Sequence, residues 1–322
     1  GRAPVYYRHI RNDNENPMTD LAMTIVVAAP EKTMPSLSAV AAYLEEVGAT
    51  IVSRDKCPVP TTLQHRRCCE LWRISATKGE LSRSRLAAIG NELKIDINLQ
   101  SSEQRLRDYR LAVFDMDSTL IECEVIDLLA ERAGVGERVA AITERAMRGE
   151  IDFDQSFKER LGLLKGLSSD VLDELLNNLP FVEGGRELML SLRSLGIKTV
   201  IVSGGFDVFA SHVASVLGMD GYLANTLAIA DGRLTGEAVM PIVNANTKRE
   251  QLLTLAHELG VTAEQSIAVG DGANDLAMLG AAGLGVAFHA KPVVRAQADY
   301  QVSHTGLDSL LYFLGHRGEL AQ

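Results

Sequence analysis

The sequence predicts an α/β protein that has a parallel sheet, a helical insertion and a separate N-terminal α+β domain. Short apolar runs (LAVFD, KTVIVSGG and SIAVGDG) alternate with helical patterns from residue 111 onward, which is typical of parallel strands buried on both faces. Residues 123–180, between the first two runs, show only helical periodicity. Residues 23–99 alternate strand-like and helix-like segments in a different order, which indicates a second domain.

The N-terminal region reads as two similar halves. Each half has a strand, a helix and a strand, and the six segments are MTIVVAA, SLSAVAAYLEEVG, ATIVSRD, CELWRISA, LSRSRLAAIGNEL and KIDINLQ. The resulting βαββαβ order predicts a ferredoxin-like layer of helices on a sheet. The polar stretch SSEQRLRDYR predicts a linker, so we expect one domain over residues 1–105 and another over 106–322.

The insertion contains four segments with apolar residues at three- and four-residue spacing, namely EVIDLLAERAG, ERVAAITERAMRGE, DFDQSFKERLGLLKG and SSDVLDELLNNL. Four helices placed after the first strand predict a cap over that strand's end. Further along, LAIADGRLTGEAV predicts a hairpin that turns at Asp231-Gly232.

Composition excludes several classes of protein. The 322 residues are 46% apolar and carry a formal charge of -10, which favours a folded core and argues against nucleic-acid binding. No apolar run is long enough to cross a bilayer, which takes about 20 residues. The N-terminal stretch is polar, so secretion is not expected. Four cysteines without a C-x-x-C pair suggest reduced thiols, and we expect a cytoplasmic protein with no membrane partner.

Polar residues follow three of the predicted strands where each strand ends. They are Asp115 and Asp117, then Ser203-Gly204-Gly205, then residues 270–275, which read GDGAND. Because ligands bind at the carboxyl ends of strands in an open α/β sheet, these sets are expected to share one crevice. Crowded carboxylates favour a divalent cation, and oxygen ligands suit Mg²⁺.

A hydroxyl, glycine N–H groups and a lysine suit a phosphoryl group. Lys248 stands near the start of a predicted helix, where a cation opposes the helix dipole. Two interpretations are open: Lys248 has a role outside the helix, or it is a solvated surface lysine. Each motif alone could be a turn or a helix cap. Together, at successive strand ends, they indicate phosphoryl transfer.

FDMDST, VSGGF, the Lys248 region and VGDGANDLAM together resemble the four motifs of the haloacid dehalogenase (HAD) superfamily. Residues 111–300, including ITERAMRGEIDFDQSFKERL, resemble the phosphoserine phosphatases within it. The resemblance implies a Rossmann-like core with an inserted cap. The N-terminal third resembles, far less specifically, the ACT-like regions that some members carry.

The resemblance implies a role for each site residue. Asp115 would be the nucleophile and Asp117 the general acid and base. Mg²⁺ would be held by the Asp115 carboxylate, the Asp117 backbone carbonyl and Asp271, with Asp275 ordering its waters. The phosphorylated group would be held by Ser203, Gly204, Lys248 and Asn274.

Recognition of the substrate would fall to the cap. Phe153, Phe157 and Arg160 lie on one side of a predicted helix. Arg160 could be snorkelling or in a structural ion pair, and Glu124 could simply favour a helix N-terminus. The resemblance instead assigns Glu124 to the substrate ammonium, Arg160 to its carboxylate, and Met147 and Phe153 to apolar positions that exclude water.

These roles predict Mg²⁺-dependent hydrolysis of O-phospho-L-serine through an aspartyl-phosphate, the last step of serine biosynthesis. Alternatives are hydrolysis of another small ester such as a sugar phosphate, transfer to an alcohol such as homoserine, and an amino-acid-responsive regulatory protein. The ACT-like resemblance allows a homodimer through the N-terminal domain. The connection AAPEKTMPSLS lacks the glycine often found where such domains receive a ligand, which counts against serine sensing.

Overall fold

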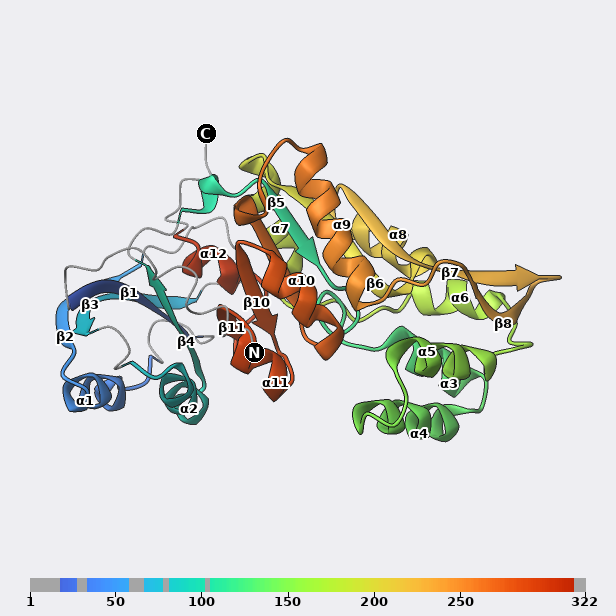
Figure 1. Ribbon diagram of the computed structural model, residues 1–322, viewed down its shortest axis with the longest axis horizontal. Coiled ribbons are helices and arrows are strands. Elements are labelled where there is room, and N and C mark those ends of the chain that lie inside the picture. Colours follow the sequence, from blue (N-terminus) through green and yellow to red (C-terminus); the bar gives the residue numbers. More distant parts are fainter. Residues whose placement is uncertain (1–17, 28–33, 58–66, 78–80, 102–104, 316–322) are drawn as a thin grey trace.

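The structure is a computed structural model that describes residues 18–27, 34–57, 67–77, 81–101 and 105–315. The polar N-terminal stretch lies outside these ranges, as do residues 28–33 of the connection AAPEKTMPSLS. A small sheet with two helices lies at one end, a larger α/β domain in the middle and a group of helices at the other end (Figure 1).

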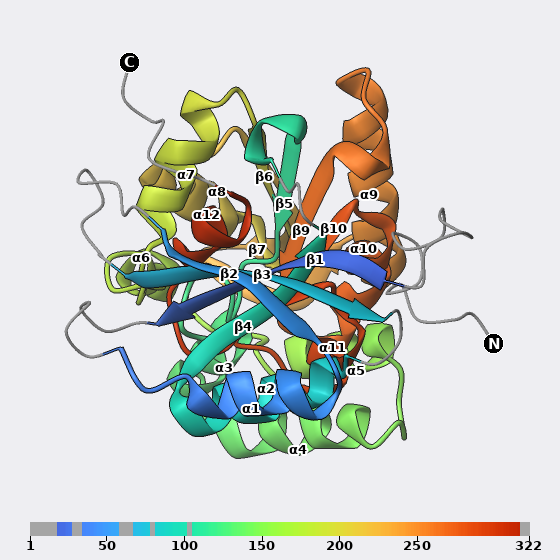
Figure 2. The same ribbon diagram turned by 90° about the vertical axis from the view of Figure 1, so that its left-hand side faces the viewer.

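The N-terminal domain has the predicted βαββαβ order. Its elements are β1 (Met18–Val27), α1 (Ser38–Glu46), β2 (Thr50–Lys56), β3 (Cys68–Thr77), α2 (Arg83–Leu93) and β4 (Ile95–Ser101). The strands form an antiparallel sheet in the order β2-β3-β1-β4, and α1 and α2 lie together on one side of it (Figure 2). Cys68 packs in the core under these helices, whereas its neighbour Cys69 packs with the larger domain, as alternation along a strand requires.

The larger domain is built on a seven-stranded sheet. Its strands are β5 (Leu111–Phe114), β6 (Lys198–Phe206), β7 (Gly221–Ala230), β8 (Arg233–Val239), β9 (Ser266–Gly270), β10 (Leu284–Phe288) and β11 (Tyr300–Val302). The order is β11-β10-β9-β5-β6-β7-β8, and only β8 runs antiparallel to its neighbour. The predicted hairpin is confirmed, since Asp231 and Gly232 join β7 to β8 with positive φ angles.

Helices cover both faces of this sheet. One face packs against α7 (Gly185–Ser194), α8 (Asp207–Leu217) and α12 (Ser309–Phe313), the other against α9 (Ala245–Glu258), α10 (Leu276–Ala281) and α11 (Pro292–Gln297). Along β5, Ala112 and Phe114 face the first group, whereas Leu111 and Val113 face the second. This is why β5 is apolar at every position.

Four helices, α3 (Val125–Arg132), α4 (Gly136–Met147), α5 (Phe153–Gly162) and α6 (Asp170–Leu176), occupy the chain between β5 and α7. We call them the cap. The two chain segments that enter and leave the cap pair with each other, because the N–H of Glu122 donates to Pro180 O and that of Val182 donates to Leu120 O. None of the helices in the described ranges has the length and apolar character needed to cross a bilayer.

The two domains meet through a polar stripe on β4. Asp96, Asn98 and Gln100 alternate with apolar residues and are buried. Asn98 exchanges two hydrogen bonds of 2.9 Å with the backbone of Gln301, and Gln100 accepts the hydroxyl of Tyr300 at 2.9 Å. The polar side chains of β4, whose alternation is typical of a half-exposed strand, therefore form the contact with the edge strand β11.

Candidate active site

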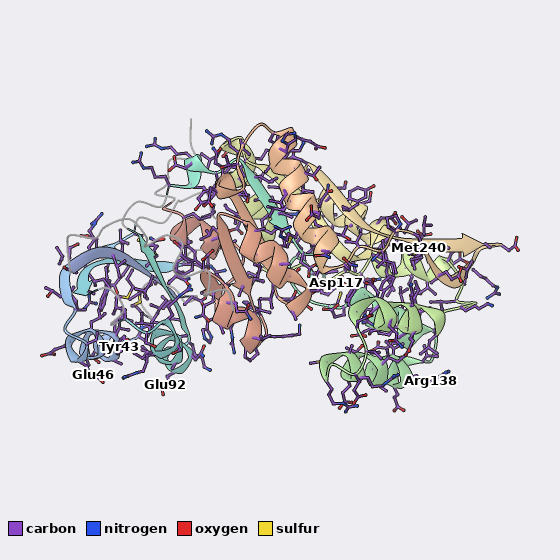
Figure 3. All side chains as sticks on the ribbon, viewed as in Figure 1. Tyr43, Glu46, Glu92, Asp117, Arg138 and Met240 are labelled. Atoms are coloured by element: carbon purple, nitrogen blue, oxygen red, sulfur yellow. The ribbon has the colours of Figure 1, made fainter. Side chains whose placement is uncertain are left out.

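The three sets of polar residues predicted at strand ends lie together. β9, β5 and β6 are neighbours at the centre of the sheet, so their carboxyl ends open at the same edge. Asp117 lies where the sheet meets the cap (Figure 3). One cavity here is lined by most of the predicted site residues, namely Asp115, Asp117, Glu124, Phe153, Arg160, Ser203, Gly204, Asp271 and Asn274.

Lys248 lies beneath the cavity floor with no exposed surface, so the alternative of a solvated surface lysine is wrong. It is in the first turn of α9, whose N-cap Asn244 accepts the N–H of Thr247. Its Nζ lies 3.0 Å from Asp115 Oδ1 and 2.8 Å from Asp275 Oδ1. Burial alone would lower the pKa of Lys248, but the two carboxylates outweigh it and hold that pKa well above its usual value.

The carboxylates fit a divalent cation. Oxygens of Asp115, Asp271 and Asp275 all lie within 4.8 Å of one another. Burial, and then neighbouring carboxylates, raise the pKa of Asp115 and Asp271, which a bound cation would relieve. Asp275 already accepts Lys248 on one oxygen and the N–H groups of Asp271 and Gly272, each at 3.1 Å, on the other. Asp271 is also contacted on both oxygens, by the Thr119 hydroxyl at 3.0 Å and by Lys291 Nζ at 3.3 Å, but Lys291 is half-exposed, whereas the partners of Asp275 are buried. All three carboxylates are candidate ligands, and Asp275 is the one most tightly held by the protein itself.

Asp117 stands apart from this cluster. Its Oδ2 accepts the N–H of Val125 at 3.4 Å, at the start of α3, whereas its buried Oδ1 has no hydrogen-bond partner among the described residues. Burial raises the pKa of Asp117 well above its usual range, and the charge of Glu124 raises it further. A carboxyl group whose protonated form is favoured in this way can deliver a proton into the cavity.

Residues 203–205 form a bulged loop near the end of β6, where the register with β7 shifts between Val202 and Phe206, and this loop is shaped to admit a ligand. A Cβ on Gly204 would lie 3.1 Å from the Phe153 ring, and one on Gly205 would lie 3.2 Å from Asp117 Oδ2. Buried Asn225 holds this loop, because its amide donates to Gly204 O at 2.9 Å and its oxygen accepts the N–H of Val243 at 2.8 Å. A side chain at either position would therefore crowd the cavity next to Phe153 or Asp117.

The cap contributes the opposite wall. Arg160 donates to Ser156 O at 3.3 Å and to the Thr143 hydroxyl at 3.5 Å, and it faces the cavity. Glu124 is the N-cap residue of α3, yet its side chain makes no capping bond and instead accepts the Ser118 hydroxyl at 2.8 Å. The cavity is thus lined by the carboxylates and the Ser203-Gly204 segment of the sheet domain, and by one acidic and one basic group on the side of the cap.

The structure differs from the sequence reading at several places. Met147, at the end of α4, is 72% exposed and does not line the cavity. Sequence reasoning missed Asn225 and Lys291, whose Nζ lies 3.3 Å from Asp271 Oδ2. It also missed Ser118 and Thr119 as individual residues, although DST was recognised as a motif. No spacing rule singles out Asn225 or Lys291, because each acts through a contact that only the fold creates.

Comparisons with known proteins agree with this geometry. The model of the family "haloacid dehalogenase-like hydrolase" matches residues 109–283. The chain is 46% identical over 236 residues to phosphoserine phosphatase SerB2 of Mycobacterium tuberculosis, an alignment that covers 73% of this chain and 58% of that protein. It is also 46% identical over 224 residues to phosphoserine phosphatase of Haemophilus influenzae, covering 70% and 71% of the two chains.

Solved structures extend the similarity to the N-terminal domain. A HAD family hydrolase from Salmonella enterica superposes with a TM-score of 0.77 at 30% identity and covers 92% of this chain and 98% of its own. A probable phosphoserine phosphatase from Vibrio cholerae superposes with a TM-score of 0.69 at 35% identity, covering 92% and 87%. The chain therefore belongs to the haloacid dehalogenase-like hydrolase family, and the two relatives compared above by sequence are phosphoserine phosphatases.

Proposed function

We propose that the protein hydrolyses O-phospho-L-serine to L-serine and phosphate. One observation carries the proposal: a single cavity presents Asp115 and the Ser203-Gly204 loop at its floor, with Glu124 and Arg160 across from them. These groups complement the phosphate, the ammonium and the carboxylate of phosphoserine. A sugar phosphate has no charged pair for Glu124 and Arg160.

The reaction would proceed in two displacements. Asp115 Oδ1 is held by Lys248, so Oδ2 is the oxygen that attacks phosphorus. The bond between phosphorus and the serine oxygen breaks as the protonated Asp117 gives its proton to that oxygen. Water then attacks the aspartyl-phosphate and gives a proton to Asp117, and the bond between phosphorus and Asp115 breaks. Lys248 and the N–H groups of the Ser203-Gly204 loop stabilise the phosphoryl oxygens in both steps.

We propose Mg²⁺ as the cofactor, held by the carboxylates of Asp115 and Asp271 and by the backbone carbonyl of Asp117. Five carboxylates surround the site (Asp115, Asp117, Glu124, Asp271 and Asp275), against the three cations Arg160, Lys248 and Lys291. With Asp117 protonated, as its role as general acid requires, the carboxylates still outnumber the cations before substrate binds, which favours a divalent ion. The ion would supply electrostatic stabilisation of the phosphoryl oxygens.

We also propose a cytoplasmic homodimer that forms through the N-terminal domain. No disulfide joins the four cysteines, all of which lie in the described part of the chain; this suits a reducing compartment. β2 is an edge strand that offers backbone groups for pairing. Light scattering on the purified chain measures the mass directly.

The test of the proposed function is phosphate release from L-phosphoserine with and without Mg²⁺. Phosphothreonine and a sugar phosphate serve as comparison substrates, and Asp115→Asn is the inactive control. We expect metal-dependent release that favours phosphoserine and is lost in Asp115→Asn. Equal turnover of the sugar phosphate would leave the hydrolase chemistry but overturn the roles of Glu124 and Arg160.

A further inference from the structure

The turn that follows β5 directs two adjacent side chains to two different carboxylates that line the cavity. Ser118 donates its hydroxyl to Glu124 Oε1 at 2.8 Å, whereas Thr119 donates to Asp271 Oδ1 at 3.0 Å. Ser118 therefore contacts the acidic group of the cap wall, and Thr119 contacts a carboxylate of the metal cluster.

The backbone at Ser118 is held in a costly conformation. Its φ is +59°, in the left-handed region that non-glycine residues seldom adopt. The N–H of Ser118 donates to Cys123 O at 3.1 Å and closes the turn one residue before Glu124. A serine kept in this conformation, where glycine would fit without strain, suggests that the hydroxyl is needed.

The Glu124 side chain does not cap α3 and instead contacts the Ser118 hydroxyl. As the N-cap residue, Glu124 would ordinarily accept the N–H of the second or third residue of the helix, but it makes no such bond, and Asp117 accepts the N–H of Val125, the first residue. Glu124 has several rotatable bonds, and its side chain is accessible to solvent at the cavity. Among the described residues, Ser118 is the one whose side chain donates a hydrogen bond to the Glu124 carboxylate, so it orients that group.

We propose that Ser118 is a positioning residue that determines specificity, because it fixes Glu124 in the orientation that receives the substrate ammonium. This inference rests on the proposed hydrolysis of phosphoserine. A carboxylate that is oriented before substrate arrives loses less conformational freedom on binding. The contribution of Ser118 should then appear only with substrates that carry an amine.

The experiment compares two substrates and two variants. The substrates are O-phospho-L-serine and 3-phosphooxypropanoate, which has the same phosphate and carboxylate but no amine. The variants are Ser118→Gly, which accepts the left-handed backbone and lacks the hydroxyl, and Thr119→Val, which loses the bond to Asp271. Thermal unfolding of each variant checks that the fold is retained.

We expect Ser118→Gly to lower kcat/KM for phosphoserine about tenfold or more, mostly through KM, as the loss of a hydrogen bond to a charged group does. Its kcat/KM for 3-phosphooxypropanoate should stay within about twofold of the unsubstituted protein. Thr119→Val should lower kcat/KM for both substrates by the same factor and raise the Mg²⁺ concentration needed for half-maximal activity. In a Glu124→Gln background, Ser118→Gly should no longer change the ratio between the two substrates.

Two results would overturn the role of Ser118 alone: an equal loss for both substrates in Ser118→Gly, or no loss for phosphoserine, each in a chain whose unsubstituted form hydrolyses phosphoserine. If the unsubstituted chain releases no phosphate from phosphoserine, both the proposed function and this inference are wrong. The activity of the unsubstituted protein therefore separates the two failures.

Discussion

Arg67 and Asp308 form a buried, two-pronged ion pair between the domains, with Nε to Oδ2 at 2.9 Å and Nη2 to Oδ1 at 2.8 Å. The side chains are 1% and 0% exposed. Arg67 directly precedes β3 and Asp308 directly precedes α12, so the pair joins the small sheet to the end of the larger domain. A Cβ on Gly306 would lie 2.5 Å from Arg67 Nη2, which explains why glycine stands there.

Arg67→Met should destabilise the protein by about 3–5 kcal/mol, because it leaves the Asp308 carboxylate buried without its partner. Arg67→Met combined with Asp308→Leu should recover much of the loss, since two apolar side chains remove both charges. Urea unfolding measures the free energy of unfolding of each variant. Arg73→Met is the matched control, because the Arg73–Asp55 pair is exposed on both sides and should contribute little. A loss in Arg67→Met no greater than in the control would contradict the structural role.

The buried carboxylates predict how stability depends on pH without metal. Burial, and then neighbouring charges, raise the pKa of Asp115, Asp117 and Asp271 above the value of about 3.9 expected for an unfolded chain. Because these pKa values are raised in the folded state, the groups contribute stability that is fully present below about pH 3.9. This contribution is lost as the pH rises through the folded-state pKa values. Mg²⁺ needs ionised ligands, so it should stabilise the protein more at about pH 8 than at about pH 5.

Calorimetry with and without Mg²⁺ at these two pH values measures the effect. At a free Mg²⁺ concentration of about 100 times its Kd, the expected stabilisation is about 2.7 kcal/mol. Asp271→Asn should remove most of the Mg²⁺-induced rise in Tm. A rise in Tm that is the same at both pH values would show that the ion binds elsewhere.

Local sequence signals predicted the fold well where one element alone determines the pattern. The apolar run of β5 and the Asp231-Gly232 turn each follow from rules that involve only nearby residues. The polar stripe of β4 shows the limit. Asp96 and Asn98 alternate with apolar residues as in a strand exposed on one face, and nothing local shows that β11 covers them.

The same limit applies to the site. Asp115 and Asp271 were found because they stand in motifs at strand ends. Lys248 remained ambiguous until the fold placed it against Asp115, and Asn225 had no signal because it acts by holding Gly204 O. The exposed position of Met147 likewise depends on how α4 packs, which its helical spacing does not specify.

Asn244 and Asp154 connect the cap to the core beside the catalytic groups. The Asn244 amide lies 3.2 and 3.3 Å from the two carboxylate oxygens of Asp154. Asp154 follows Phe153, whose ring packs on Gly204, and its helix α5 also carries Arg160. This contact therefore holds α5, with its substrate-facing side chains, against the loop that cradles the phosphate.

Asn244→Asp should lower kcat/KM for phosphoserine about tenfold or more, because it sets two carboxylates against each other while an aspartate still caps α9 through Thr247. Adding Asp154→Asn restores an amide opposite a carboxylate with the polarity reversed, so the double variant should return to within about threefold of the unsubstituted protein. Asp154→Asn alone, which keeps a hydrogen-bonding pair without charge, should lose less than Asn244→Asp. Steady-state kinetics of the three variants measure the coupling. Losses that simply add in the double variant would show that the two side chains do not act together and that α5 is held over the cavity by its apolar contacts alone.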